Sequence, residues 1–450
     1  MMDLSGKKIS VIGAARSGIG AARLIQKMGG VPFVSDSASD DKLKASVKVL
    51  AIENIEYETG KHSDKIFDCD FMIISPGVPS DAEVITKAKQ KKIKMISEVE
   101  LASRFCKGKI IAITGTNGKT TTTSLCGHVF ESCGKKSYVA GNIGLAFSEI
   151  ASDVKENEFV VLEVSSFQLD LIEKFKPVVA VILNITPDHL NRYENSVEKY
   201  ALSKQRIYEN QDKDDYLVVN GDDDTTLKYL KSYKSKSFLF SLEEEQHNGC
   251  YVNGTKIINK KNNSENFSCT TDDITIRGEH NVANAMAVII IAKIFELDSE
   301  GLKKALKSFQ GVEHRLEFVK EIDGIKFIND SKATNVDSVW YALRSFNEPI
   351  FLILGGQDKG NDYEKIKQLI IDKVQKIYAI GSSAEKIFNF FHSFVKVEIK
   401  ESLEEVASAS LSEAREGDVV LLSPACASFD MFDNYEHRGR VFKNAVNNLL

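Results

Sequence analysis

The sequence predicts an α/β protein of three domains, each built around a parallel sheet. Apolar, β-branched strands alternate with helices along most of the chain, which is the order that parallel sheets require. Glycine-rich loops join a strand to a helix near residue 13 and again near residue 115. At roughly 150 residues a domain, a chain of 450 residues can form three cores. We place the domains at residues 1–97, 98–311 and 312–450.

The composition excludes several classes of protein. A hydrophobic content of 43% and a charged content of 27% are ordinary for a globular protein. The formal net charge of −6, without a basic stripe, predicts no nucleic-acid partner. The seven cysteines form no C-x-x-C pair, which favours reduced intracellular thiols over disulfides or a zinc site. The start is polar and no apolar run reaches the roughly 18 residues of a membrane span, so we expect a cytoplasmic protein without signal peptide or span.

The N-terminal residues predict a Rossmann-like domain. A strand is followed by the glycine-rich segment Gly13–Gly20, which opens a helix, and by a second strand ending at Asp36. The dinucleotide-binding pattern has its second glycine where this chain has Ala15. Asp36 is well spaced for a ribose hydroxyl. These features favour a site for a phosphate-linked nucleoside, NAD or a UDP-sugar, over a fold of this kind without a ligand.

The central domain contains a nucleotide loop. The strand at residues 110–114 runs into Gly115–Thr120, and a helix follows. Glycines let backbone N–H groups face phosphates, the helix N-terminus adds partial positive charge, and Lys119 adds a full one. Thr120 places a hydroxyl where a phosphate-bound Mg2+ binds. Ile113 stands where the full pattern has its outer glycine, and a tight turn without function is the alternative, but the order of strand, loop and helix favours an ATP-using protein.

Three polar clusters follow strands of the central domain, at the edge where open α/β sheets bind ligands. They are Gly141–Gly144, Leu162–Gln168 and Asn184–Leu190. Glu163 ends an apolar strand in a domain with a phosphate loop, which predicts a Mg2+ ligand rather than a helix cap. His189 lies in the third cluster, and we expect it to contact ligand or substrate rather than to serve as a packed or capping histidine.

The second half of the central domain is less informative. The helix at residues 196–209 carries Lys204, for which spacing predicts only a solvated face. Residues 234–277 are polar and rich in strands, with Asn253-Gly254 as a hairpin turn and residues 262–266 as a loop tip.

A long apolar helix opens at Gly278–Asn284, and the C-terminal domain follows it. Asp323-Gly324 predicts a hairpin, after which strands and helices alternate as in another Rossmann-like sheet. Polar segments at Asp330–Asn335, Gly355–Gly360 and Ser423–Asp430 follow three of its strands. These segments therefore lie where a parallel sheet places its ligands.

Seven motifs occur in an order typical of one family. They are Gly115–Thr120, Glu163–Gln168, Asn184–His189, Gly278–Asn284, His314-Arg315, Asp330–Asn335 and Ser423–Asp430. Over essentially its whole length the chain resembles the Mur ligases, which add amino acids to the peptidoglycan precursor. Three of its segments, Ser-Ser-Phe-Gln, Asp-Ser-Lys-Ala-Thr-Asn and Ser-Pro-Ala-Cys-Ala-Ser, most closely resemble the corresponding sequences of the family member that adds D-glutamate. The family's phosphate loop also lacks the outer glycine.

The resemblance implies roles for individual residues. Those that bind ATP are Gly115, Thr116, Asn117, Gly118, Lys119, Thr120, Thr121, Asn281, Arg315 and Asp330. Those that hold two Mg2+ ions are Thr120, Glu163, His189 and Lys204, the last as a carbamate formed with CO2. The catalytic residues are Lys119, Glu163, His189 and Lys204. Those that bind a UDP-sugar substrate are Gly13, Ser17, Asp36, Ser75 and Asn142. Those that bind D-glutamate are Lys332, Thr334, Lys359, Ser428 and Tyr435.

The resemblance also implies an activity. It is that of an ATP-dependent ligase adding D-glutamate to UDP-N-acetylmuramoyl-L-alanine in peptidoglycan precursor synthesis. The L-alanyl carboxylate would take the γ-phosphate to give an acyl phosphate, and the amine of D-glutamate would displace phosphate through a tetrahedral intermediate. Two metal ions, Lys119 and helix N-termini would neutralise the anions that meet. We expect the enzyme to be a monomer.

Three other functions stay open at this point. The nearest is a sister amide ligase, such as a folylpolyglutamate synthase or another muramyl ligase. A nicotinamide-dependent dehydrogenase built on residues 1–97 is disfavoured by Ala15 and by the phosphate loop. A nucleotide-gated binding module without catalysis is disfavoured by Glu163, His189 and Asp330 together.

Overall fold

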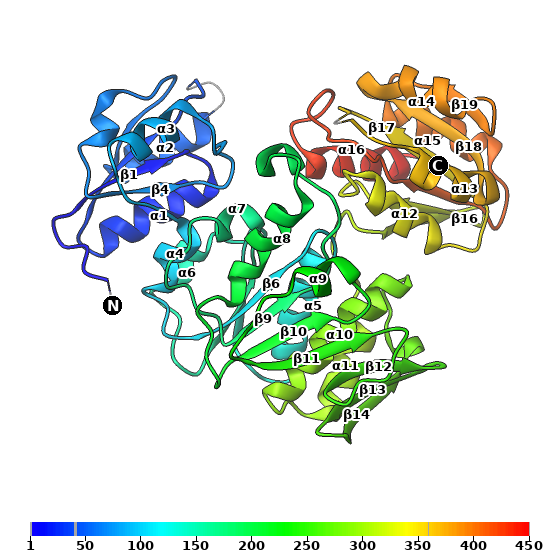
Figure 1. The fold of residues 1–450 in the computed structure, drawn as a ribbon. Coiled ribbons are helices and arrows are strands. Elements are labelled where there is room, and N and C mark those ends of the chain that lie inside the picture. The colour runs from blue at the N-terminus through cyan, green and yellow to red at the C-terminus, as the bar shows by residue number, and fades with distance from the viewer. Residues whose placement is uncertain (1, 40–42, 359, 450) are drawn as a thin grey trace. The chain divides into compact units, whose positions relative to one another are not determined.

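The computed structural model of the chain describes residues 2–39, 43–358 and 360–449 (Figure 1). Its strands form three sheets. Their strand orders are β3-β2-β1-β4-β5, β14-β13-β12-β11-β10-β9-β6-β8-β7 and β15-β16-β20-β17-β18-β19. All pairs are parallel except β12–β13, β13–β14 and β15–β16. The predicted α/β class with three largely parallel sheets is confirmed. Within the described ranges, every helix is too short or too polar to cross a membrane.

The first sheet has the predicted β-α-β order. Its elements are β1 (Lys8–Ile12), α1 (Arg16–Lys27), β2 (Val31–Ser35), α2 (Lys44–Ile52), β3 (Glu56–Glu58), a 3-10 turn (Asp64–Phe67), β4 (Phe71–Ile74), α3 (Glu83–Gln90) and β5 (Met95–Ser97). Strand β1 is central and pairs in parallel with β2 and β4. Helix α2 and strand β3 are absent from the sequence-based prediction, because a strand of three residues is too short to show a period.

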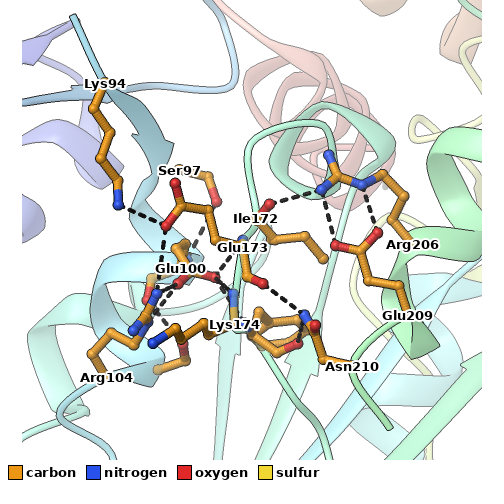
Figure 2. Close-up of polar contacts among 12 residues, drawn as sticks. Lys94, Ser97, Glu100, Arg104, Ile172, Glu173, Lys174, Arg206, Glu209 and Asn210 are labelled. Carbon is orange, nitrogen blue, oxygen red and sulfur yellow. Dashed lines mark hydrogen bonds and ion pairs between the residues drawn. The ribbon is translucent and has the colours of Figure 1, made fainter.

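The junction between the first two sheets is tightly bonded. Strand β5 passes into α4 (Glu98–Ser103) without an intervening residue. The buried carboxylate of Glu100 accepts hydrogen bonds from the N–H groups of residues 173–175, at 2.8 to 3.0 Å (Figure 2). Lys94 pairs with Glu173 at 2.7 Å beside it. Charged acceptors make strong hydrogen bonds, so α4 and the loop before β9 form one block.

The second sheet holds the phosphate loop near its centre. Its parallel strands are β6 (Lys109–Thr114), β7 (Ser137–Gly141), β8 (Phe159–Glu163), β9 (Val179–Ile182), β10 (Tyr216–Asn220) and β11 (Lys236–Ser241). Its helices are α5 (Lys119–Ser132), α6 (Phe147–Ile150), α7 (Ser166–Leu169), α8 (Val197–Gln205), α9 (Asp224–Tyr229), α10 (Glu279–Ile294) and α11 (Ser299–Ser308), with 3-10 turns at Leu190–Tyr193, Arg206–Tyr208 and Thr271–Asp273. Because β6 lies between β8 and β9, the segments after these two strands flank the loop.

An antiparallel extension widens this sheet. It consists of β12 (Gly249–Asn253), β13 (Lys256–Lys261) and β14 (Ser264–Thr270), and β12 joins β11 in parallel. The hairpin predicted at Asn253-Gly254 is confirmed. The predicted loop tip at residues 262–266 is wrong beyond its first two residues. Asn262 and Asn263, with φ of +53° and +64°, make a two-residue turn, and Ser264 already begins β14.

The third sheet belongs to the C-terminal part of the chain. Its elements are β15 (Glu317–Ile322), β16 (Ile325–Asn329), α12 (Val336–Arg344), β17 (Ile350–Gly355), α13 (Glu364–Lys373), β18 (Val374–Ile380), a 3-10 turn (Gly381–Ser383), α14 (Ala384–Phe391), β19 (Lys396–Ile399), α15 (Leu403–Glu413), β20 (Val419–Leu422) and α16 (Tyr435–Asn447). The hairpin predicted at Asp323-Gly324 joins β15 to β16. Residues after β16, β17 and β20 therefore share one edge of the sheet.

The chain divides into two compact units. The first comprises Met1–Asp273 and Ala283–Ser308, and the second comprises Ile274–Val282 and Phe309–Leu450. The first unit contains the N-terminal and central sheets, and the second contains the C-terminal sheet. The residues expected to bind ATP are consequently divided between them.

Candidate active site

The phosphate loop is fixed by a glycine and by an asparagine. Gly118 has a φ of +83°, and a Cβ at this position would lie 2.5 Å from Asn284 Oδ1, so only glycine fits. Asn184, which follows β9, accepts from the N–H of Asn117 at 2.8 Å and donates to its carbonyl at 3.1 Å. The sequence placed Asn184 in a polar cluster without giving it a role. Its position directly after an apolar strand was the available signal.

Two lysines meet at the first glycine of this loop. Lys119 Nζ donates to the carbonyls of Gly115 at 2.9 Å and Thr116 at 2.8 Å. Lys204 Nζ donates to the same Gly115 carbonyl at 2.7 Å and is only 1% exposed. Burial, and secondarily the nearby Lys119 cation, hold the pKa of Lys204 well below its usual value. The solvated face predicted for Lys204 from helical spacing is therefore wrong.

Helix α8 brings Lys204 to the loop because that face of the helix is buried. Tyr200, one turn earlier, is buried, and Lys204 Nζ lies 4.6 Å from the centre of its ring. The Tyr200 hydroxyl lies 3.4 Å from Thr116 Oγ1, and either atom can donate. Residues four apart share a helix face, so the spacing of Lys204 from an aromatic residue was the signal that could have found it.

The residues expected to hold Mg2+ are brought to the same edge of the second sheet. Glu163 ends β8 opposite Ile113 of β6 and is almost fully buried. Thr120 is buried in the first turn of α5. A buried carboxylate and a hydroxyl beside a phosphate loop form the oxygen donor set that Mg2+ prefers, so these residues fit the ion.

His189 has a more exposed position. Its backbone has a φ of +52°, and its Nε2 lies 3.5 Å from Asp188 Oδ2. The ring packs edge-on against Phe167, with 5.2 Å between ring centres. The segment after β9 and the segment after β8 thus meet through these two rings.

The residues expected to bind a UDP-sugar lie at the carboxyl edge of the first sheet, except for Asn142. Gly13, with a φ of +98°, accepts at its carbonyl from Ser75 Oγ at 3.3 Å. The Asp36 carboxylate accepts from the N–H of Ala14 at 2.7 Å and so holds the glycine loop. Ser17 lies in the first turn of α1. The glycine loop, the segments that follow β2 and β4, and the start of helix α1 therefore place their polar groups together at this edge of the sheet.

Asn142 lies on the second sheet, against the expected metal ligand. Its Nδ2 donates to Glu163 Oε1 at 3.0 Å, and its backbone N–H donates to the Glu163 carbonyl at 3.0 Å. One residue expected at the UDP-sugar and one expected at the metal are therefore in direct contact.

The second unit contains the remaining residues expected at the nucleotide. Asp330 is buried, and its carboxylate accepts from Ser423 Oγ at 2.8 Å. Burial raises the pKa of Asp330 to about 7, against the opposing effects of Ser423 and Arg315. Among the described residues, the buried Nε of Arg315 has no hydrogen-bond partner. Asn281 donates to the carbonyl of Arg277 at 2.6 Å. A buried guanidinium N–H without a partner fits a ligand with phosphate or hydroxyl oxygens, such as a nucleotide.

Four of the five residues expected to bind D-glutamate lie on the third sheet's edge or on α16. Lys332 Nζ lies 5.1 Å from the centre of the Tyr435 ring, and the N–H of Thr334 donates to the Lys332 carbonyl at 2.9 Å. Ser428 is buried in the segment after β20. Lys359 lies outside the described residues.

Arg438 was not predicted from the sequence, yet it connects the three segments that follow β16, β17 and β20. Its fully buried guanidinium donates to the carbonyls of Ser331 at 2.8 Å, Cys426 at 3.1 Å and Gly355 at 3.5 Å. Burial lowers its pKa to about 10. The segments that follow β16, β17 and β20 are thus held by one cation. Its only sequence signal was a position one turn after Tyr435.

Family profiles match all three parts of the chain. The Mur ligase middle domain matches residues 113–292, the glutamate ligase domain of Mur ligases matches residues 314–426, and the MurD N-terminal domain matches residues 8–84. The three matched regions contain the phosphate loop, the C-terminal sheet and the first glycine loop in turn.

Full-length relatives carry one name. A UDP-N-acetylmuramoylalanine–D-glutamate ligase of Chloroherpeton thalassium is 43% identical over 464 residues, with 99% of each chain covered. Proteins of that name from Thermoanaerobacter pseudethanolicus and Caldicellulosiruptor saccharolyticus are 42% and 43% identical, with at least 99% of each chain covered. The chain belongs to the Mur ligase family. It is therefore a ligase of peptidoglycan precursor synthesis, a process in which this family uses ATP.

Solved structures of the family share the fold. The UDP-N-acetylmuramate–alanine ligase MurC of Thermotoga maritima is 22% identical, with a TM-score of 0.64 over 98% of this chain and 99% of that one. The MurF ligase of the same organism is 16% identical, with a TM-score of 0.61 over 93% of this chain and 96% of that one.

Proposed function

We propose that this ligase joins D-glutamate to UDP-N-acetylmuramoyl-L-alanine with cleavage of ATP. The observation that carries the proposal is the buried amine of Lys204 on the carbonyl of Gly115, beside Lys119. A phosphate loop alone needs no second buried lysine. The names of the full-length relatives support D-glutamate as the amino acid.

The residues around the loop suit the transfer of phosphate to a carboxylate. Lys119 would turn from the loop carbonyls to the phosphate oxygens of ATP, and Thr120 and Glu163 would hold Mg2+. A metal ion at this position neutralises charge on the phosphates. The resulting acyl phosphate is an electrophile that the amine of D-glutamate can attack, with phosphate leaving from the tetrahedral intermediate. The loop N–H groups would stabilise negative charge during the first step.

Lys204 would act as a carbamate. A lowered pKa favours the neutral amine of a buried lysine, and the lone pair of that amine can form a C–N bond to CO2 with loss of one proton. The product carries oxygen atoms in place of an ammonium, and with His189 it would provide ligands for a second Mg2+. The contact of Lys119 with the same carbonyl would place a cation near the new anion.

The substrates would be divided among three domains at residues 1–97, 98–311 and 312–450. The UDP-sugar would bind the edge that carries Gly13, Ser17, Asp36 and Ser75, with Asn142 from the second sheet. D-glutamate would bind near Lys332, Thr334, Lys359, Ser428 and Tyr435. We also propose a monomer in the cytoplasm, where all seven cysteines stay reduced.

A coupled phosphate-release assay tests the reaction. With ATP, Mg2+ and UDP-N-acetylmuramoyl-L-alanine present, D-glutamate should stimulate phosphate release, and L-alanine, meso-diaminopimelate and folates should not. The variants Lys119→Ala and Glu163→Ala should each lose activity. Stimulation by another amino acid in place of D-glutamate, or near-normal turnover in either variant, would refute the assignment.

The carbamate has a spectroscopic test. Protein equilibrated with 13C-bicarbonate should give a carbamate carbon signal that disappears in Lys204→Ala and persists in Lys199→Ala. Lys199 lies on the same helix but is half-exposed and pairs with Glu194, so it is a matched control. Full activity of Lys204→Ala, or a signal that survives in it, would refute the role of Lys204.

A further inference from the structure

Arg16 extends from the first sheet to the second. It begins helix α1, directly after the glycine loop, and its guanidinium reaches the turn at residues 141–144. Nη1 donates to the carbonyl of Gly144 at 2.6 Å, and Nη2 donates to those of Asn142 at 3.0 Å and Gly141 at 3.4 Å. All three acceptors are backbone carbonyls, so the rigid guanidinium holds the shape of the turn.

The turn at residues 141–144 packs directly on Glu163. Asn142 contacts Glu163 through both its side chain and its backbone N–H. Gly141 has a φ of +104°, and a Cβ there would lie 2.3 Å from the Glu163 carbonyl oxygen. The backbone of Gly141 therefore lies directly against the Glu163 carbonyl, which couples the position of the turn to that of Glu163. Two successive contacts, of Arg16 with the turn and of the turn with Glu163, connect the start of helix α1 with the expected metal ligand.

A second arginine makes the reverse connection. Arg192 follows β9 in the second sheet and donates to the carbonyls of Pro76 at 2.9 Å and Val78 at 2.6 Å, in the turn after β4. Its guanidinium lies 3.8 Å from the centre of the Phe167 ring. Each sheet thus contributes one arginine that binds carbonyls of the other.

We propose that Arg16 is a positioning residue of the ligase, which keeps the Asn142 turn and the Glu163 carboxylate in register with the loop that binds the UDP-sugar. The proposal rests on the proposed function and assigns Arg16 no contact with a reacting atom. It follows that the UDP-sugar site and the metal site share one structural support. A change at Arg16 then affects the use of two ligands at once and leaves the D-glutamate site unaffected.

Steady-state kinetics of Arg16→Gln test this coupling. Removing residues that orient metal ligands typically costs about 10–100-fold, and we expect the lower end for a residue that acts through Asn142. The KM for UDP-N-acetylmuramoyl-L-alanine and the Mg2+ concentration for half-maximal rate should both rise about tenfold. The KM for D-glutamate should stay unchanged. Arg16→Lys, which retains a cation but not the planar fork, should recover part of the loss.

Lys27→Ala is the matched control. Lys27 lies on the same helix and pairs at 2.7 Å with Asp153, which follows helix α6 in the central domain, so its loss removes a contact between the same parts of the chain, away from the turn at residues 141–144. It should keep unaltered kinetics, and both variants should keep the thermal transition of the unaltered protein within a few degrees. Kinetics of Arg16→Gln equal to those of Lys27→Ala would overturn the proposal.

The outcome for the unaltered protein separates this proposal from the proposed function. If the unaltered protein ignores D-glutamate, the proposed function fails. Calorimetric titration of UDP-N-acetylmuramoyl-L-alanine with Mg2+ into both proteins then decides the role of Arg16. Weaker binding by Arg16→Gln supports it, and equal binding overturns it.

Discussion

The pH dependence of stability should reveal the buried carboxyl of Asp330. Its two hydrogen bonds, from Ser423 Oγ at 2.8 Å and from the N–H of Leu316 at 3.3 Å, do not offset burial, which raises its pKa to about 7. In the unfolded chain the pKa of an aspartate is about 3.9. Between these values the folded protein retains a proton that the unfolded chain releases. Stability due to this group is therefore greatest below about pH 4 and falls as the pH rises towards 7.

The size of this effect follows from the shift in pKa. A difference of about three pH units, at about 1.36 kcal/mol each, gives on the order of 4 kcal/mol. Asp330→Asn has the shape of the neutral acid and cannot ionise, so its stability should lack this decrease. For a unit of this size, 1 kcal/mol corresponds to roughly 2–4 °C in the midpoint of unfolding. We expect Asp330→Asn to unfold about 10 °C higher than the unaltered protein at pH 8, and at nearly the same temperature at pH 4.

Differential scanning calorimetry from pH 4 to pH 8 measures this difference. Asp372→Asn is a suitable control, because its carboxylate is exposed and accepts a hydrogen bond from Gln368 Nε2 on the same helix. The control should follow the unaltered protein at every pH. Parallel curves for Asp330→Asn and the unaltered protein would refute the reasoning, because they would show that Asp330 ionises alike in both states.

Three further substitutions test the loop and the junction. Asn184→Ala removes two hydrogen bonds to Asn117 and should weaken ATP binding about tenfold in calorimetric titration, at about 1.4 kcal/mol for a factor of ten. Gly118→Ala would place a Cβ against the side chain of Asn284, and the left-handed backbone at this position would alone cost an alanine roughly 1–2 kcal/mol. ATP binding should therefore be lost, and an unchanged affinity for ATP would contradict the steric argument. Glu100→Ala leaves three N–H groups without their acceptor, among them the buried N–H of Phe175, and should lower stability by about 3 kcal/mol in urea titration, whereas an unchanged midpoint would exclude a structural role.

Much of the fold could be predicted from local sequence. Strands of a parallel sheet are buried on both faces, so β6, β8, β9 and β17 appear as uninterrupted apolar segments. Hairpins at Asn253-Gly254 and Asp323-Gly324 follow from turn chemistry. The loop predicted at residues 262–266 was too long, because the polar residues that begin the exposed edge strand β14 resemble a loop in sequence.

The candidate site was less accessible to such reasoning. Residues at strand ends, such as Glu163, are predictable because topology alone brings them together. Asn184 and Arg438 were not predicted, and a role for Lys204 was implied by the family resemblance alone, because these roles depend on contacts between segments far apart in the chain. Helical spacing assigns a lysine to solvent by default, and only packing shows when that default fails.

The antiparallel extension of the second sheet also has a practical consequence. Five strands separate β14 from β6 in the sheet, and at about 4.8 Å per strand the outer strand lies on the order of 29 Å from the strand that carries the phosphate loop. The turn at Asn262-Asn263, at the outer edge, is exposed on both residues. A fluorophore or a surface tether attached there would label the protein far from its phosphate loop.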